Sequence, residues 1–178
     1  YVPTNAADIA HYKFPKIGFT MQALLNAIAQ MHNTTDAHRV FHGRGGMYPD
    51  CEHWTLDWFA PVWVLTSFKS VSADALAQCQ AALQVRWNEL APGEPLNWVF
   101  QCRAPGEAET RLMAGSVPEP HVVTEQGAKY LVHVMRGQNH GLFLDMANGR
   151  EWLKSHAKHE NVLNLFAYTC AFSVVALQ

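Results

Sequence analysis

The sequence has no CxxC pair and no regular cysteine spacing, although it contains four cysteines. Disulfide frameworks and zinc knuckles need such spacings, so scattered thiols favour a protein of the reducing cytoplasm. We find no N-terminal signal peptide and no apolar run of membrane-spanning length, which favours a cytoplasmic location without membrane contact. Because the chain begins with Tyr1 rather than methionine, we expect it to be trimmed at its ends.

Charge of either sign is also scarce, with 13 Lys and Arg against 15 Asp and Glu. The formal net charge of −2 argues against a broad basic surface for nucleic acid, although a local patch can be hidden in the average. Internal repeats, low-complexity tracts and the dinucleotide fingerprint GxGxxG are absent. The chain is instead rich in apolar residues, which make up 49% of it, and it is long enough to form one domain with part of another.

Two helices are predicted from apolar residues at helical spacing. The first follows Thr20, a good N-cap residue, and the second follows Ser72. The apolar positions are Met21, Leu24, Leu25, Ile28 and Met31 in the first, and Leu76, Cys79, Leu83, Trp87 and Leu90 in the second. Residues 33–50 between them are glycine-rich and polar and are predicted as a loop.

Strands are predicted where β-branched and aromatic residues gather. Residues 54–68 are expected to form two short strands separated at Pro61, and residues 97–102 a third. Residues 103–120 look like a polar loop, and 121–135 like a hairpin that turns at Gln126–Gly127. A short helix over 148–157 is followed by an apolar strand over 161–167, of the kind buried on both faces of a parallel sheet.

This order predicts an α+β domain over residues 1–135, with a strand–helix–strand unit and a hairpin, that could bind substrate or RNA. Residues 136–178 are predicted to begin an α/β Rossmann-like domain. In such folds ligands bind at the carboxyl ends of parallel strands, and the first strand–helix turn approaches them closely. The turn at 164–173 has the small residues that this requires, although such a unit is more often only part of the core.

Three stretches resemble motifs of one family. VLNLFAYTCAFSVVAL (162–177) resembles the first motif of class I S-adenosylmethionine-dependent methyltransferases, in the form found in the bacterial methyltransferases of large-subunit ribosomal RNA. EQGAKYLVHVM and GLFLDMANGR resemble that family's Glu-x-Gly hairpin and its Leu-Asp-x-x-x-x-Arg segment, so that the match covers residues 125–177. A weaker similarity over 48–68 resembles the domain that precedes the catalytic domain in these enzymes.

The resemblance implies an enzyme that transfers a methyl group from S-adenosylmethionine to a base of ribosomal RNA. The implied cofactor-binding residues are Phe143, Asp145, Arg150, Asn164, Phe166, Tyr168, Thr169, Cys170, Ala171, Phe172 and Ser173. The Arg150 guanidinium suits the cofactor carboxylate, because arginine offers a fixed fork of donors. The family commonly has glycine at position 170, and Gln-Arg or His-Arg where this chain has Met146–Ala147. The catalytic residues are expected outside this chain, which should not turn over alone.

Other roles stay open for the same residues. Asp145 can cap the following helix, Arg150 can be a solvated charge, and Tyr168 can simply pack. Cys170 can be a small buried hydrophobe. The unit as a whole can be a non-catalytic binding or dimerisation module with a degenerate cofactor turn, or part of a methyltransferase that acts on a small molecule or a protein. RNA is the expected partner, and a homodimer is compatible with the sequence.

Two further groups of residues have side chains suited to a site. Zinc would need a set such as His38, His42, Cys51 and His53, but with no CxxC pair we predict no metal site. The loop FHGRGGMYPD (41–50) can hold an anion through His42, Arg44 and its glycine amides, although a plain surface loop is the commoner role. If the chain binds RNA directly, we expect contacts at this loop and at Arg103 and Arg111. Exposed rings among Trp54, Trp58 and Trp63 could then stack on unpaired bases.

Overall fold

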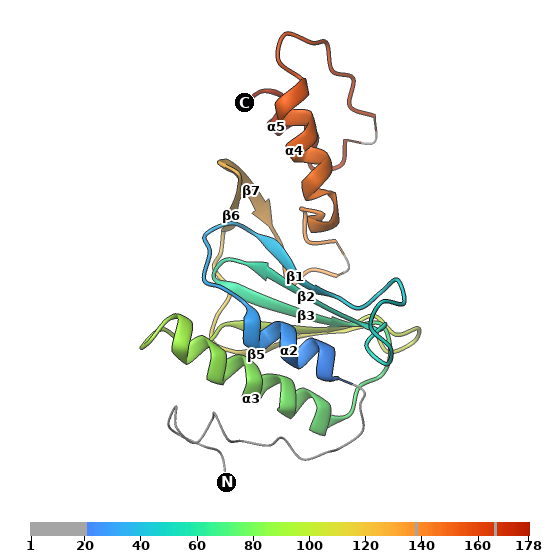
Figure 1. Cartoon of the computed structure of the whole chain (residues 1–178), viewed down its shortest axis with the longest axis vertical. Coiled ribbons are helices and arrows are strands. Elements are labelled where there is room, and N and C mark those ends of the chain that lie inside the picture. Colours follow the sequence, from blue (N-terminus) through green and yellow to red (C-terminus); the bar gives the residue numbers. More distant parts are fainter. Residues whose placement is uncertain (1–20, 138, 166) are drawn as a thin grey trace.

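The computed structural model describes residues 21–137, 139–165 and 167–178 (Figure 1). Five strands form a sheet in the order β1-β2-β3-β4-β5. They are β1 (His38–His42), β2 (Trp54–Phe59), β3 (Val62–Ser67), β4 (Trp98–Cys102) and β5 (Glu109–Ala114). Neighbouring strands are antiparallel except β3 and β4, which are parallel because helix α3 (Ala73–Leu90) connects them.

One face of this sheet is covered by α3 and by α2 (Gln22–Gln30) (Figure 1). Side chains alternate between the faces of a strand, so Trp54, Leu56 and Trp58 of β2 all point to the helices. The two predicted helices are therefore confirmed, and α3 is capped by Ser72, whose Oγ accepts from the Ala75 amide. Thr20, the cap predicted for the first helix, lies outside the described residues.

The opposite face of the sheet packs on the hairpin of β6 (His121–Glu125) and β7 (Ala128–Val132), which is present as predicted. Sheet residues in this second core are Phe59, Val62, Val64 and Val99. The remaining inner positions on this face are polar, with Thr55, Asp57 and Thr66 all buried. Buried polar side chains in the middle of a sheet are unusual and need partners, so this half of the face is the first place to look for a site.

The C-terminal region contains the 3₁₀ turn η1 (Leu144–Met146), α4 (Ala147–His156) and α5 (Ala171–Ala176). Helix α4 confirms the helix predicted over 148–157. The strand predicted over 161–167 is wrong, because the described residues there form no strand. Leu163 and Leu165 are 82% and 67% exposed. A strand needs a partner for its backbone groups, and no described strand pairs with this segment, so apolar character alone does not make it extended.

Two loop predictions also need correction, because β1 lies within residues 33–50 and β5 within residues 103–120. Both strands lie at the edges of the sheet, and β5 is mostly solvent-exposed. Edge strands bury few side chains and therefore lack the apolar pattern by which strands are recognised. In the described ranges we find no helix that is both long and apolar enough to cross a membrane.

Candidate functional site

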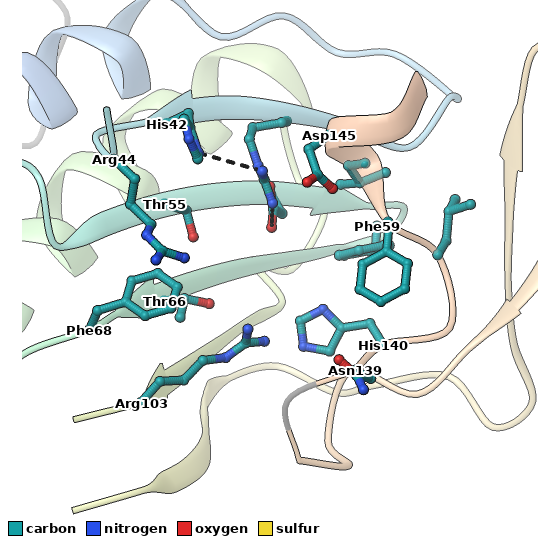
Figure 2. Close-up of a pocket in the computed structure, with 15 residues that line it drawn as sticks. His42, Arg44, Thr55, Phe59, Thr66, Phe68, Arg103, Asn139, His140 and Asp145 are labelled. Carbon is teal, nitrogen blue, oxygen red and sulfur yellow. Dashed lines mark hydrogen bonds and ion pairs between the residues drawn. The ribbon is translucent and has the colours of Figure 1, made fainter. Parts of the chain in front are cut away.

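A pocket of about 210 Å³ opens on the helix-free face of the sheet, between its strands and residues 139–145 (Figure 2). Its lining is strongly polar and includes Arg39, His42, Arg44, Thr55, Asp57, Thr66, Arg103, His140 and Asp145. Figure 2 shows Arg44 and Arg103 on the side opposite His140, Phe59 and Asp145. Residues far apart in the chain are thus gathered at one place.

A β-bulge in β1 aims two of these side chains into the pocket. Arg39 lies opposite Asp57, and His42 lies opposite Thr55, with a register shift between Arg39 and Phe41. Residues three apart in a regular strand point to opposite faces, so the extra residue is needed to bring Arg39 and His42 to the same face. The sequence shows no sign of this bulge.

Arg39 is held by a buried carboxylate. Its Nε and Nη2 donate to Oδ1 and Oδ2 of Asp57 at 2.8 and 3.2 Å. Burial raises the pKa of the Asp57 carboxyl, and the hydrogen bonds from Arg39 oppose that shift. The pair therefore neutralises itself inside the protein, and neither charge is left over for a ligand.

Arg44 and Arg103 are arranged around the ring of Phe68. Their guanidinium carbons lie 4.3 and 5.8 Å from its centroid. Phe68 and Arg103 directly follow the parallel strands β3 and β4, which pair up to Ser67 and Cys102, so both residues lie at the carboxyl ends of these strands. Burial lowers the pKa of Arg103; the charge of Asp57 opposes this shift, and the nearby charges of Arg39 and Arg44 add to it.

The position of Arg44 depends on the glycine before it. The Gly43 amide donates to the carbonyl of Trp54 at 2.9 Å, and a Cβ at this glycine would overlap the carbonyl of Cys51. Only glycine permits so close an approach of two backbone segments. The glycine-rich loop is therefore fixed to the sheet at Gly43. This contact places the next residue, Arg44, in the pocket lining.

His140 forms the opposite wall and is kept neutral. It lies edge-on to Phe59, with ring centroids 5.3 Å apart, and its Nε2 is buried with no hydrogen-bond partner among the described residues. Burial, together with the charges of Arg103 and Arg39, lowers the pKa of His140 to about 3. A protonated imidazole at this position would be repelled by the positive charges of Arg103 and Arg39.

We expect this histidine to make the protein less stable in acid. Its pKa is about 3 when folded and 6.5 when solvated, so below pH 6.5 the unfolded state binds a proton that the folded state does not. Stability is thus lost as the pH falls, by about 2 kcal/mol between pH 6.5 and 5, at about 1.4 kcal/mol per pH unit. Urea unfolding of wild type and His140→Gln at both pH values measures this share. Identical pH slopes for the two proteins would contradict it.

The cofactor-binding residues predicted from the family motif lie on two adjoining segments. The rings of Phe143 and Tyr168 lie 5.4 Å apart, and Thr169 Oγ1 donates to the Gly141 carbonyl at 2.5 Å. The Asn164 amide donates to Ser173 Oγ at 2.9 Å. The structure thus brings these segments together, but Asp145 lies on the pocket wall and Ala171 is buried in the second core. Phe166 lies outside the described residues.

Arg150 is turned inward. Its side chain is 2% exposed, and Nε and Nη2 donate to both carboxylate oxygens of Glu125 at 2.5 and 2.7 Å. Nη1 donates to the Phe143 carbonyl at 2.9 Å. The alternative that Arg150 is a solvated charge is therefore wrong. A contact with the cofactor carboxylate stays a prediction, and three donors of the guanidinium are already used by the protein.

The turn before α5 has two residues in the left-handed region, Tyr168 at φ 50° and Cys170 at φ 60°. Glycine adopts this conformation without strain, which explains why the family commonly has glycine where this chain has Cys170. Cys170 is exposed, so the alternative of a buried small hydrophobe is wrong. Phe172, in contrast to these exposed residues, has its ring against Gly149. The ring centroid lies 6.0 Å from the Arg150 guanidinium.

The structure decides two other expectations. Trp54, Trp58 and Trp63 are buried in the helix-side core, so they cannot stack on bases. The helix-cap role of Asp145 is wrong, because Met146 is the N-cap of α4 and makes no side-chain cap bond. Among the described residues, no group of three or more side chains of the metal-binding kind is close enough to hold an ion.

Residues 38–178 match the family described as S-adenosylmethionine-dependent methyltransferase. The matched region holds the whole sheet, the hairpin, the pocket and both segments of predicted cofactor residues. The chain therefore belongs to this family, whose cofactor is S-adenosylmethionine.

Two curated proteins are similar to this chain in sequence. The chain is 28% identical over 160 residues to Ribosomal RNA large subunit methyltransferase I of Erwinia tasmaniensis, covering 86% of this chain and 40% of the relative. It is 37% identical over 71 residues to the protein of the same name from Pseudoalteromonas atlantica, covering 40% of this chain and 18% of that protein. The chain thus spans less than half the length of the curated relatives it matches.

Solved structures show the same fold. A protein of Streptococcus mutans described as an S-adenosylmethionine-dependent methyltransferase superposes with a TM-score of 0.64 at 24% identity, covering 91% of this chain and 43% of that chain. A methyltransferase complexed with S-adenosylhomocysteine (SAH) gives 0.63 at 25% identity and the same coverage. The chain therefore shares its fold with these two solved structures.

Proposed function

We propose that the protein containing this chain is a methyltransferase that transfers a methyl group from S-adenosylmethionine to a base of ribosomal RNA. The observation that carries the proposal is the family match over residues 38–178. The names of the relatives favour ribosomal RNA as the substrate. In this proposal residues 1–135 form a domain that contacts the substrate, and residues 136–178 begin the cofactor domain.

The described residues fit one side of such a cofactor. Phe143 and Tyr168 are 47% and 56% exposed, and their rings lie together on the surface. Exposed paired rings of this kind offer a stacking surface for a nucleoside. When bound, S-adenosylmethionine supplies a methyl group on a positively charged sulfur.

The chain's own residues act in this proposal by holding that surface in place. The ion pair of Arg150 and Glu125 fastens the Phe143 backbone to the hairpin. Thr169 Oγ1 donates to the Gly141 carbonyl and so holds the turn before α5 next to the segment that carries Phe143. Fixed positioning of this kind is how enzymes bring a nucleophile and a transferable group into line.

Calorimetry with S-adenosylmethionine on the complete protein tests the proposal. We expect saturable binding, and weaker binding for Tyr168→Ala, because that change removes half of the exposed ring pair. Trp152→Ala is the matched control, since Trp152 is exposed but stacks only on His156 of its own helix. Absence of binding even at millimolar cofactor would contradict the proposal and would favour a non-catalytic module with a degenerate cofactor turn.

A further inference from the structure

Two positively charged side chains in the pocket, Arg44 and Arg103, form no ion pair with a described residue. Arg39 is taken by Asp57, but the ion pairs found among the described residues leave Arg44 and Arg103 without a carboxylate. Among the described residues, Nη2 of Arg103 donates only to the neutral side chain of Gln101, at 2.9 Å. Its Nε is buried and has no hydrogen-bond partner in the described part of the chain. A buried donor left without a partner is costly, so a ligand that accepts from it gains affinity.

The fold keeps these two charges close to each other. One ring, that of Phe68, lies against both guanidinium groups, and the Gly43 contact with Cys51 fixes the backbone before Arg44. Like charges held together in this way raise the local positive potential, which an anion would relieve. The hydroxyls of Thr55 and Thr66 line the same end of the pocket and add neutral donors.

We propose that Arg44 and Arg103 bind one phosphodiester group of a nucleic acid strand; that the strand is the RNA substrate rests on the proposed function. Guanidinium groups match phosphate oxygens in charge and in geometry. The carboxylate of Asp145 also lies on the pocket lining and acts on Arg39, which Asp57 already neutralises, so Asp145 repels an anion from the Arg39 side. The phosphate is therefore placed at the Phe68 end.

This position links the substrate to the predicted cofactor segment. The wall opposite Arg44 and Arg103 is formed by residues 139–145, which include Phe143 and Asp145 (Figure 2). A strand whose phosphate is held at the arginines has its neighbouring nucleotides within reach of that wall. The pocket would thus hold the strand beside the segment that is expected to contact the cofactor.

Fluorescence anisotropy of the full chain with a labelled single-stranded RNA of about 20 nucleotides, in the absence of cofactor, tests the proposal. Arg44→Ala and Arg103→Ala should each weaken binding about tenfold, the loss expected for a charged hydrogen bond. In the double variant Arg44→Ala with Arg103→Ala, the slope of log K against log salt should fall by about 0.7, as for one phosphate contact on a single strand. Arg44→Lys and Arg103→Lys, which keep the charge, should retain part of the affinity.

Lys129→Ala is the control. Lys129 is exposed on β7 and does not line the pocket. Unchanged binding for both pocket variants, or an equal loss for Lys129→Ala, would overturn the proposal. Competition by millimolar inorganic phosphate as strong as that by unlabelled RNA would assign the pocket to free phosphate and overturn it as well. Because no cofactor is used, each of these results leaves the methyltransferase proposal standing.

Discussion

Glu125→Gln should destabilise the protein by about 3–5 kcal/mol, because it leaves the Arg150 guanidinium buried without its counter-ion. The side chains of Arg150 and Glu125 are 2% and 7% exposed, so water cannot replace the lost carboxylate. The change also weakens the link between the Phe143 backbone and the hairpin, because the guanidinium that donates to the Phe143 carbonyl loses its charged partner. Urea unfolding followed by far-UV circular dichroism measures the loss.

Two further variants show whether the effect comes from the uncompensated charge. Glu89→Gln breaks the exposed pair with Arg86 and should change the stability by less than about 0.5 kcal/mol. The double variant Glu125→Gln with Arg150→Met should recover part of the loss, because an apolar side chain tolerates a buried site. If the double variant is as unstable as Glu125→Gln alone, buried charge is not the cause.

Trp63→Ala should cost about 3–5 kcal/mol, the range found when a large aromatic side chain is removed from a core. Trp63 is fully buried on β3, with its ring 4.2 Å from that of Trp58 and 6.1 Å from that of Trp87. These contacts join the sheet to α3. The same strand presents Thr66 to the pocket on its other face, so we also expect weaker RNA binding in this variant.

Trp63→Phe separates ring packing from the polar group of the indole. The indole N–H of Trp63 is buried without a hydrogen-bond partner among the described residues, so its removal costs nothing in hydrogen bonding. Phenylalanine keeps most of the ring contacts, and we expect it to cost less than half as much as alanine. Equal losses for the two variants would contradict this explanation. Chemical unfolding read by circular dichroism avoids interference from the changed tryptophan fluorescence.

The elements that the sequence predicts correctly are marked by patterns of residues that are close together in the chain. Helix α3 was recognised from an apolar stripe that repeats every three to four residues, and its cap from Ser72 alone. The hairpin was recognised from two short runs around Gln126–Gly127. The family motifs are likewise contiguous, so short stretches of sequence are enough to show the resemblance to methyltransferases, and the match over residues 38–178 bears it out.

The elements that were missed depend on partners distant in the sequence. The sequence predicts a loop at strand β1 because the burial of β1 comes from β2, and it predicts a strand after α4 although no described strand pairs with that segment. The ion pair of Glu125 and Arg150 joins two motif residues that the sequence named separately and never together. His140 carries no sequence signal at all, because its unusual pKa comes entirely from burial and from arginines elsewhere in the chain.

The family of this protein, its helices and most of its strands follow from the amino-acid sequence alone, because they depend on neighbours along the chain. The sequence also names His42, Arg44 and Arg103 as residues that could contact RNA, but it gives no reason for Arg103 to lie beside the other two. That they share a pocket is a property of the folded chain. The bulge in β1 turns His42 to the pocket face, and the parallel pairing of β3 and β4 brings Phe68 next to Arg103. Strand register is set by packing across the whole sheet, which no short stretch of sequence specifies.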